Sequence, residues 1–419
     1  MKKLITTLTN IWKIEELRNR ILNTLLFLLI YRVGCHVVLP GVNPEALVVN
    51  REGGNDIMNL INMFAGGSFS RAAIFALGVM PYISASIVVQ LLGIAVPAFQ
   101  KMQKEGESGR KKMNNITRYL TVAITLVQAV AYVKTQIGPE AKTIADPMFS
   151  ILSAVVLTAG TLFVMWLGEK ITDKGIGNGI SLIIMAGIIA QLPAGITAEW
   201  ASRMSPSGGG PIPLLLEFVA LFFVVIFTIL VVQGVRKIPV QYAKKIVGNK
   251  QIGGVRQYIP LKVNAAGVMP IIFAQAIMFL PMSLTQFFPN VQSDFLNSLS
   301  NYTSVTYNVV FALLIIAFTF FYTAIMVNPQ QMSEDMKKNG GFIPGIKPGY
   351  ETNLFIDNVI SHITFPGAVF VAIIAILPAI ATLFGVNNQF AHFYGGTSLL
   401  ILVGVVLDTI QQIESHLLM

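Results

Sequence analysis

Long apolar stretches separated by short polar or charged segments recur along the whole chain. Each stretch runs for about 17 to 25 residues, the length that a helix needs to cross the hydrocarbon core of a bilayer. The pattern predicts ten such helices, centred near Leu29, Ser84, Ile124, Leu157, Met185, Val225, Phe273, Phe318, Val371 and Val403. Alternating apolar strands, which are typical of membrane barrels, are not evident. The predicted fold class is therefore an all-α integral membrane protein.

Composition supports this class. Of the 419 residues, 54% are hydrophobic and only 12% are charged, against about 25% charged in an average soluble protein. The single cysteine, Cys35, excludes an internal disulfide and a cysteine metal cluster, and we expect it to be buried as a small apolar residue.

The segment from Asn55 to Ala65 is amphipathic, but at about 11 residues it is too short to cross a membrane. Asparagines mark its polar face and aliphatic or aromatic residues its apolar face: Asn55, Asn59 and Asn62, then Ile57, Leu60, Ile61 and Phe64. Gly66 and Gly67 permit the chain to turn after it. We then expect a span that begins near Ala72 and is kinked at Pro81 in its middle.

The motif Gly-Val-Met-Pro occurs twice, at residues 78–81 and at residues 267–270. These positions fall in the second and the seventh predicted spans, which is the same place in two halves of five. An odd number of spans per half forces the second half to insert from the opposite side. Inverted halves with proline-interrupted segments at matching positions indicate a pathway between them, although two ordinary proline kinks would look the same.

Positive charge fixes the expected orientation. Of the 29 Lys and Arg residues, 23 lie in segments that would share one side of the membrane with the amino terminus, so the positive-inside rule places both termini in the cytoplasm. We expect three regions: an amino-terminal interfacial segment at 1–20, a first half at 21–200 and a second half at 201–419.

Two long segments of the second half, 234–264 and 328–353, carry the most prominent surface charge. The first has seven cations and no carboxylate. Such a run of charge forms either a solvated face or a docking site for an acidic or polyanionic partner. The second has a proline and glycine framework that would hold an exposed tip stiffly. The candidate docking residues are Arg236, Lys237, Lys244, Lys245, Lys250, Arg256, Lys262 and Lys347.

Catalytic and nucleotide-binding motifs are not found in the sequence. Carboxylates are nearly absent from the predicted spans apart from Asp408, whereas ion-coupled transporters generally need buried ionisable groups. A secondary transporter of small solutes and an intramembrane enzyme are thus the weaker alternatives. Aliphatic residues spaced four apart, such as Ile180 and Ile184, fit either helix packing or the lining of a pore.

Six runs resemble the SecY family, the channel subunits of the Sec protein translocase. They are I-F-A-L-G-V-M-P-Y-I-S-A-S-I (74–87), K-E-G-E-S-G-R-K-K (104–112), W-L-G-E-K-I-T-D-K-G-I-G-N-G-I-S (166–181), P-L-K-V-N-A-A-G-V-M-P (260–270), N-G-G-F-I-P-G-I-K-P-G (339–349) and Y-G-G-T-S-L-L-I (394–401). The runs are spread over nearly the whole chain in family order.

The resemblance implies a clamshell of two inverted five-helix halves that pass unfolded secretory chains across the membrane and release apolar segments sideways into lipid. It implies a plug at residues 55–67, which includes Asn55, Ile57, Asn59, Leu60, Asn62, Phe64, Gly66 and Gly67. It implies a pore ring of Val79, Ile83, Ile87, Ile180, Ile184, Ile272 and Ile401. It implies a lateral gate that includes Pro81, Gln90, Gln128, Pro270 and Gln275.

The same resemblance implies partners and a location, but no enzymatic activity and no cofactor or metal. The partners are the membrane subunits SecE and SecG, the SecA ATPase, a ribosome that presents its RNA and proteins to the basic loops, nascent secretory and membrane polypeptides, and lipid. The location is the cytoplasmic (inner) membrane. Lys347 stands where the family commonly has Arg, so the charge remains but a forked donor does not.

Overall fold

The computed structural model describes residues 12–44, 46–47, 62–206, 209–242, 245–247, 250–252, 256–287, 298–299, 301 and 303–418. In chain order its elements are α2 (Glu15–Gly34), α4 (Met80–Ala95), α5 (Pro97–Lys104), α6 (Glu107–Gln136), η2 (Pro139–Ala141), α7 (Met148–Lys174), α8 (Gly179–Met204), α9 (Pro211–Gln233), β1 (Val235–Tyr242), β2 (Lys245–Val247), β3 (Lys250–Ile252), β4 (Arg256–Lys262), α10 (Met269–Phe287), α12 (Val305–Met326), α13 (Pro329–Lys338), β5 (Gly341–Phe342), α14 (Tyr350–Leu383), α15 (Asn388–Ala391) and α16 (Gly396–Leu418).

A helix lies at each of the ten predicted span centres: α2, α4, α6, α7, α8, α9, α10, α12, α14 and α16. Within the described ranges, 7 helices are long and apolar enough to cross a membrane on their own. The pair α4 and α5, taken as one bent span, gives an eighth. The helix α2 carries charges at both ends, and α4 and α10 are comparatively short.

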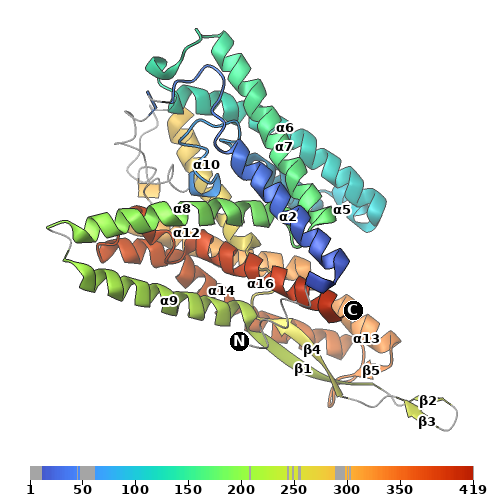
Figure 1. Ribbon diagram of the computed structural model, residues 1–419. Coiled ribbons are helices and arrows are strands. Elements are labelled where there is room, and N and C mark those ends of the chain that lie inside the picture. Colours follow the sequence, from blue (N-terminus) through green and yellow to red (C-terminus); the bar gives the residue numbers. More distant parts are fainter. Residues whose placement is uncertain are drawn as a thin grey trace. The chain divides into compact units, whose positions relative to one another are not determined.

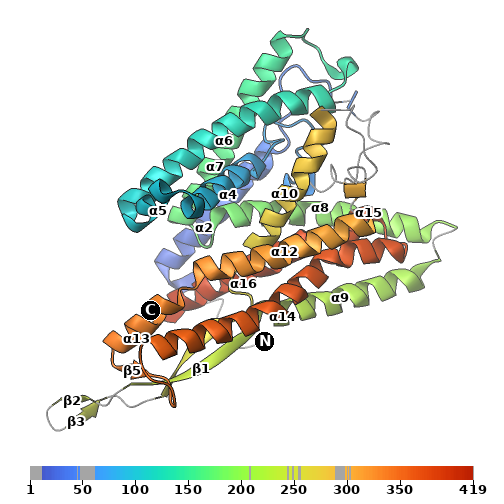
Figure 2. The same ribbon diagram turned by 180° about the vertical axis from the view of Figure 1, so that it is seen from behind.

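The chain separates into two compact units. The first consists of Met1–Ser202, Asn387–Phe390 and Val405–Met419, and the second of Arg203–Val386 and Ala391–Gly404. In the first unit α6 packs against α4 and α7, and in the second α12 packs against α10 and α14 (Figures 1 and 2).

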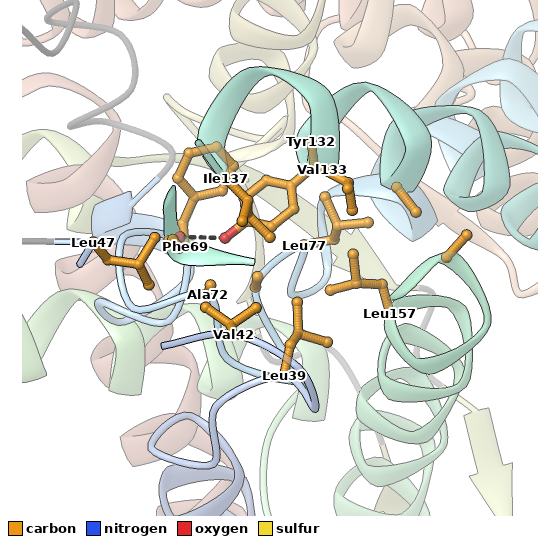
Figure 3. Packing of buried hydrophobic residues seen from close by; sticks show 14 of the residues in the cluster. Leu39, Val42, Leu47, Phe69, Ala72, Leu77, Tyr132, Val133, Ile137 and Leu157 are labelled. Carbon is orange, nitrogen blue, oxygen red and sulfur yellow. Dashed lines mark hydrogen bonds between the residues drawn. The ribbon is translucent and has the colours of Figure 1, made fainter. Parts of the chain in front are cut away.

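The core of the first unit is built around a segment that is not helical. Residues 68–79, which we call the first elbow, form successive turns that are almost entirely buried. Phe69 and Leu77 from the elbow pack with Val133 of α6 and Leu157 of α7 (Figure 3). The hydroxyl of Tyr132 donates a 2.6 Å hydrogen bond to the carbonyl of Phe69, so a polar backbone group inside this core has a partner.

The predicted kink at Pro81 is wrong. The helix α4 begins at Met80, and Pro81 lies in its first turn. Proline suits that place because the first helical N–H groups have no intrahelical acceptor. The apolar residues before Pro81 lie in the elbow, whose backbone bonds to the chain that follows α2. The N–H of Ile74 donates to the carbonyl of Val37 at 2.9 Å, and the N–H of Leu39 donates to the carbonyl of Ala72 at 2.8 Å.

The second unit contains strands that the sequence reading did not anticipate in the charged segments. Strand β1 pairs antiparallel with β4 and also with β5, so the sheet order is β4-β1-β5 and the two segments 234–264 and 328–353 are joined. Strands β2 and β3 form a separate small hairpin beyond the ends of β1 and β4 (Figures 1 and 2).

One face of this sheet buries a small apolar core. Its central residues come from β1, β4, α13, the turn after β5 and the start of α14: Ile238, Val240, Leu261, Met336, Ile343 and Ile356. Alternate residues of β1 point inward, as the two-residue period of a strand requires. The core therefore fixes the outer, charged face of the sheet as a defined surface.

Candidate functional site

The segment expected to be a plug is described only at its carboxyl-terminal end. Asn55, Ile57, Asn59 and Leu60 lie outside the described residues. Residues 62–64 are helical, and Gly66 and Gly67 follow in turns with positive φ values of 64° and 85°. Glycine adopts this backbone region without steric cost, so the glycine pair ends the helical segment as predicted.

The residues just after the helical segment are held by hydrogen bonds within the first unit. The N–H of Gly67 bonds the carbonyl of Asn62 at 2.8 Å, and the side-chain oxygen of Asn62 accepts from the N–H of Ser70 at 3.0 Å. The hydroxyl of Ser68 lies 2.6 Å from the carbonyl oxygen of Ala65. The chain that follows residues 62–64 is therefore held in one path by these bonds.

The seven residues of the expected pore ring lie on four helices or at their starts. Val79 immediately precedes α4, and Ile83 and Ile87 follow at one-turn intervals on that helix. Ile180 and Ile184 are one turn apart on α8, Ile272 is near the start of α10, and Ile401 is in α16. Five of them belong to the first unit and two to the second, so the ring as a whole stays a prediction.

The residues expected at a lateral gate lie on α4, α6 and α10. Pro81 and Pro270 are buried in the first turns of α4 and α10. Gln90, Gln128 and Gln275 are half-buried. The amide nitrogen of Gln90 donates to the hydroxyl of Ser86 one turn earlier, at 3.2 Å, so this amide can satisfy a donor within its own helix.

The candidate docking residues mark the outer face and the tip of the sheet region. Lys237 lies opposite Pro260 in the β1–β4 pairing, and Lys262 lies opposite Val235. Both lysines are exposed, and both lie on the face turned away from Ile238 and Val240. Tyr258, which is 56% exposed, belongs to the same face. The face thus presents cations beside an aromatic ring.

Two of the remaining docking residues, Arg236 and Lys347, are exposed. By the pairing register Arg236 belongs to the other face of β1, the one that carries Ile238. The Lys347 backbone is fixed by a 2.8 Å bond from the Thr352 hydroxyl to its carbonyl. For Lys245, Lys250 and Arg256 the structure describes the backbone, and Lys244 lies outside the described residues.

Sequence reasoning missed two buried carboxylates, which lie toward the ends of predicted spans. Glu199 of α8 is fully buried and accepts the N–H of Asn387 at 2.7 Å. Glu217 of α9 is paired with Arg203, which also donates to the carbonyl of Gly385 at 2.8 Å. The spacing of Glu199 and Arg203, four apart on one helix, was the available signal. In the described ranges no group of three or more His, Cys, Asp and Glu could hold a metal ion.

Comparison with solved structures defines the class of fold. The chain shares its fold with a structure described as a protein-conducting channel, with a TM-score of 0.66, 17% identity, and coverage of 95% of this chain and 92% of that one. It also shares the fold of Sec61 in the canine ribosome-channel complex from the endoplasmic reticulum, with a TM-score of 0.60, 16% identity, and coverage of 95% and 92%. The architecture is the ten-helix clamshell of membrane protein channels.

Sequence comparison identifies the family. The SecY family matches residues 73–410. Protein translocase subunit SecY of Staphylococcus carnosus is 42% identical over 98% of this chain and 96% of its own length. The same subunit of Halalkalibacterium halodurans is 42% identical over 98% and 97%. This chain belongs to the SecY family. It is a multi-pass membrane protein that serves as a protein-conducting channel subunit of a protein translocase, and the family is not one of enzymes.

Proposed function

We propose that unfolded secretory polypeptides pass through an aliphatic ring in this chain and that apolar segments leave sideways between α4 and α10. The proposed ring consists of Val79, Ile83, Ile87, Ile180, Ile184, Ile272 and Ile401. Membership of a family of protein-conducting channels, together with the purely aliphatic character of these seven positions, carries the proposal. A narrow aliphatic constriction dewets and so blocks ions, yet it makes no directional bonds that a passing chain would have to break.

Residues 55–67 act as the plug in this proposal, and Pro81, Gln90, Gln128, Pro270 and Gln275 belong to the gate. A solved structure of the same fold, with a TM-score of 0.61 and 17% identity, is described by the statement that the plug domain of the SecY protein stabilises the closed state and maintains a membrane seal.

A cross-linking experiment tests the path of the polypeptide. Cys35 is buried, and replacing it with Ala gives a cysteine-free chain. Single cysteines are then placed at Ile83, at Ile272 and, as a control, at Leu215 of α9, which is 67% exposed within the chain. A stalled secretory chain should cross-link to the first two positions and not to the control. Cross-linking at Leu215 alone, or equally at all three, would refute the proposed path.

The outer face of the sheet is the proposed docking site for the driving partner, either the SecA ATPase or a translating ribosome. Its exposed Lys237 and Lys262 make it a cationic surface on a rigid base, and Lys347 is exposed in the loop between β5 and α14. We place this face in the cytoplasm, with both termini, at the cytoplasmic (inner) membrane, and we propose SecE and SecG as membrane partners. Energy then comes from the docked partner.

Charge reversal tests this docking site. Exposed charges at an interface mainly raise the association rate and make it depend on salt. Replacing Lys237 and Lys347 with Glu should therefore slow partner binding and flatten its salt dependence, as measured by surface plasmon resonance with the purified complex in nanodiscs. Lys111→Glu is the control, because Lys111 is also exposed but pairs with Glu107 on α6. Equal losses in the reversal and the control would argue against a specific docking face.

A further inference from the structure

Arg32 is a charged residue near the end of the first apolar helix, α2. Its side chain is half-buried, whereas its neighbours Leu29 and Val33 are 61% and 59% exposed. An ionisable side chain inside a membrane helix is costly and normally meets a specific partner. One Arg32 guanidinium nitrogen, Nη1, lies 3.0 Å from the carbonyl oxygen of Gly66.

The Gly66 carbonyl belongs to the turn that follows the helical residues 62–64, and Gly66 is buried. A buried backbone carbonyl needs a hydrogen-bond donor. Hydrogen bonds with a charged donor are about twice as strong as neutral ones. Arg32 therefore supplies a strong donor to the backbone at the point where the plug segment joins the rest of the first unit.

Neighbouring groups hold the same point. The Cys35 sulfur, one turn from Arg32, lies 4.0 Å from the carbonyl oxygen of Ala65. On α8, a Cβ at Gly187 would stand 2.7 Å from the carbonyl oxygen of Phe64, so the absence of a side chain there lets the segment lie directly against the helix. At Gly66 a Cβ would meet Arg32 at 2.8 Å and Gly187 at 3.1 Å. The segment is closely contacted by both helices.

We propose that Arg32 is a positioning residue that anchors the carboxyl-terminal end of the plug. The anchor holds the backbone at Gly66 against α2, beside the contacts that hold Phe64 and Ala65. When the channel is at rest, this contact keeps the carboxyl-terminal end of the plug in one position. This inference rests on the proposed function of residues 55–67 as the plug.

The test measures how well the resting channel seals. The purified translocase complex is reconstituted into liposomes, and chloride efflux is recorded without a substrate polypeptide. Losing a hydrogen bond from a charged donor shifts an equilibrium by about tenfold or more, so Arg32→Gln should raise the resting efflux clearly. Arg18→Gln on the same helix is the control and should leave efflux unchanged, because the side-chain partner of Arg18 among the described residues is the exposed Glu15, at 3.9 Å.

Deletion of residues 55–65, alone and combined with Arg32→Gln, separates this inference from the plug proposal. If deletion raises efflux and Arg32→Gln adds nothing to it, Arg32 acts through the plug. If deletion raises efflux but Arg32→Gln alone does not, the inference is wrong and the plug proposal stands. If deletion leaves efflux unchanged, the plug proposal itself fails. An additive effect of the two changes would overturn the role assigned to Arg32.

Arg32→Lys covers the case in which Arg32→Gln does not accumulate. Lysine keeps the charge but offers a point donor in place of a planar fork. We expect a smaller rise in efflux than with Gln, and secretion driven by a strong signal sequence should be unchanged. The proposal would be overturned if the glutamine variant failed to fold and the lysine variant showed the same efflux as the unaltered chain. Arg32 would then serve stability alone.

Discussion

Residues 78–81 and 267–270 carry the same four amino acids and adopt the same backbone in the two units. The glycine has a positive φ in both, 53° at Gly78 and 63° at Gly267. Each glycine N–H bonds a carbonyl three residues earlier, at 2.9 Å and 3.4 Å. A helix begins at the methionine in each case, α4 at Met80 and α10 at Met269.

The surroundings of the two motifs differ. The first elbow is long, buried and covered by neighbouring helices, and its Ile74 carbonyl lies against Gly160 of α7. The second elbow, residues 263–268, is short. Its Val263 N–H bonds the Gly234 carbonyl at 2.8 Å, and its Val263 carbonyl lies against Gly367 of α14. Four residues thus specify where a helix begins, whereas the packing around them specifies the path by which the chain arrives.

The largest effect should come from filling the space beneath each elbow. A Cβ at Gly160 would stand 2.2 Å from the Ile74 carbonyl oxygen, and a Cβ at Gly367 would stand 2.6 Å from that of Val263. Both neighbours are backbone and cannot rotate away. Overpacking typically costs about 1–3 kcal/mol. We expect both substitutions to lower the unfolding free energy by an amount in the upper half of this range, Gly160→Ala by more than Gly367→Ala.

Thermal unfolding in detergent measures this difference. Gly404→Ala is a suitable control, because its Cβ would meet only the end of the Val268 side chain, at 2.8 Å, and a side chain can shift. A cost at Gly367 equal to or above that at Gly160 would mean that the two elbows are held equally tightly.

A smaller effect should follow from replacing the glycines of the motif. A residue with a Cβ costs about 1–2 kcal/mol in the left-handed region. Alanine adds no clash at either place. Its Cβ would have its nearest neighbour 3.7 Å away at Gly78, and no neighbour within 4 Å at Gly267. Gly78→Ala and Gly267→Ala should therefore lower stability equally.

Asparagine separates the two sites. It tolerates the left-handed region better than alanine, so Gly267→Asn should recover part of the alanine loss. Gly78→Asn should not, because Gly78 is buried beside Ala65 and the polar side chain would lose its solvent. Recovery at both positions, seen as equal unfolding midpoints, would show that the burial of the first elbow has no energetic consequence.

The smallest effect should come from the prolines. Proline lacks a backbone N–H, but in the first turn of a helix that N–H would have no partner. Pro81→Ala and Pro270→Ala should therefore each change the unfolding free energy by less than about 1 kcal/mol. A proline in the interior of a helix costs roughly 3 kcal/mol. Circular dichroism should show unchanged helix content. A large gain in stability or helicity at either site would indicate that the proline interrupts a helix after all.

Much of the fold could be predicted because it depends on long apolar runs and on glycine turns. All ten span centres fall in helices, and the turn between α7 and α8 contains Gly175 and Gly177, the latter with φ of 80°. The start of α4 could not be predicted, because a buried irregular segment is as apolar as a helix. The candidate ring and gate residues were assigned by resemblance to a family, since stripes of isoleucine also suit ordinary helix packing.

The charged segments of the second unit were harder still. Only Ile238 and Val240 show inward alternation in β1, a pattern too short to separate from chance. Most of the strand pairs with β4, and its end pairs with Gly341 and Phe342, which lie far along the chain. The partners of Arg203 likewise come from other elements, Glu217 from α9 and Gly385 from the turn after α14.

The sequence by itself determined that this chain lies in a membrane, where ten of its helices are centred and where glycines turn the chain. These features follow from the transfer of apolar side chains out of water and from the conformational limits of glycine and proline, which act within a few residues. The tertiary structure alone decided which apolar residues form the first elbow, which charges become buried and which carbonyl Arg32 holds. Those outcomes depend on backbone groups finding hydrogen-bond partners far along the chain, where no local pattern records them.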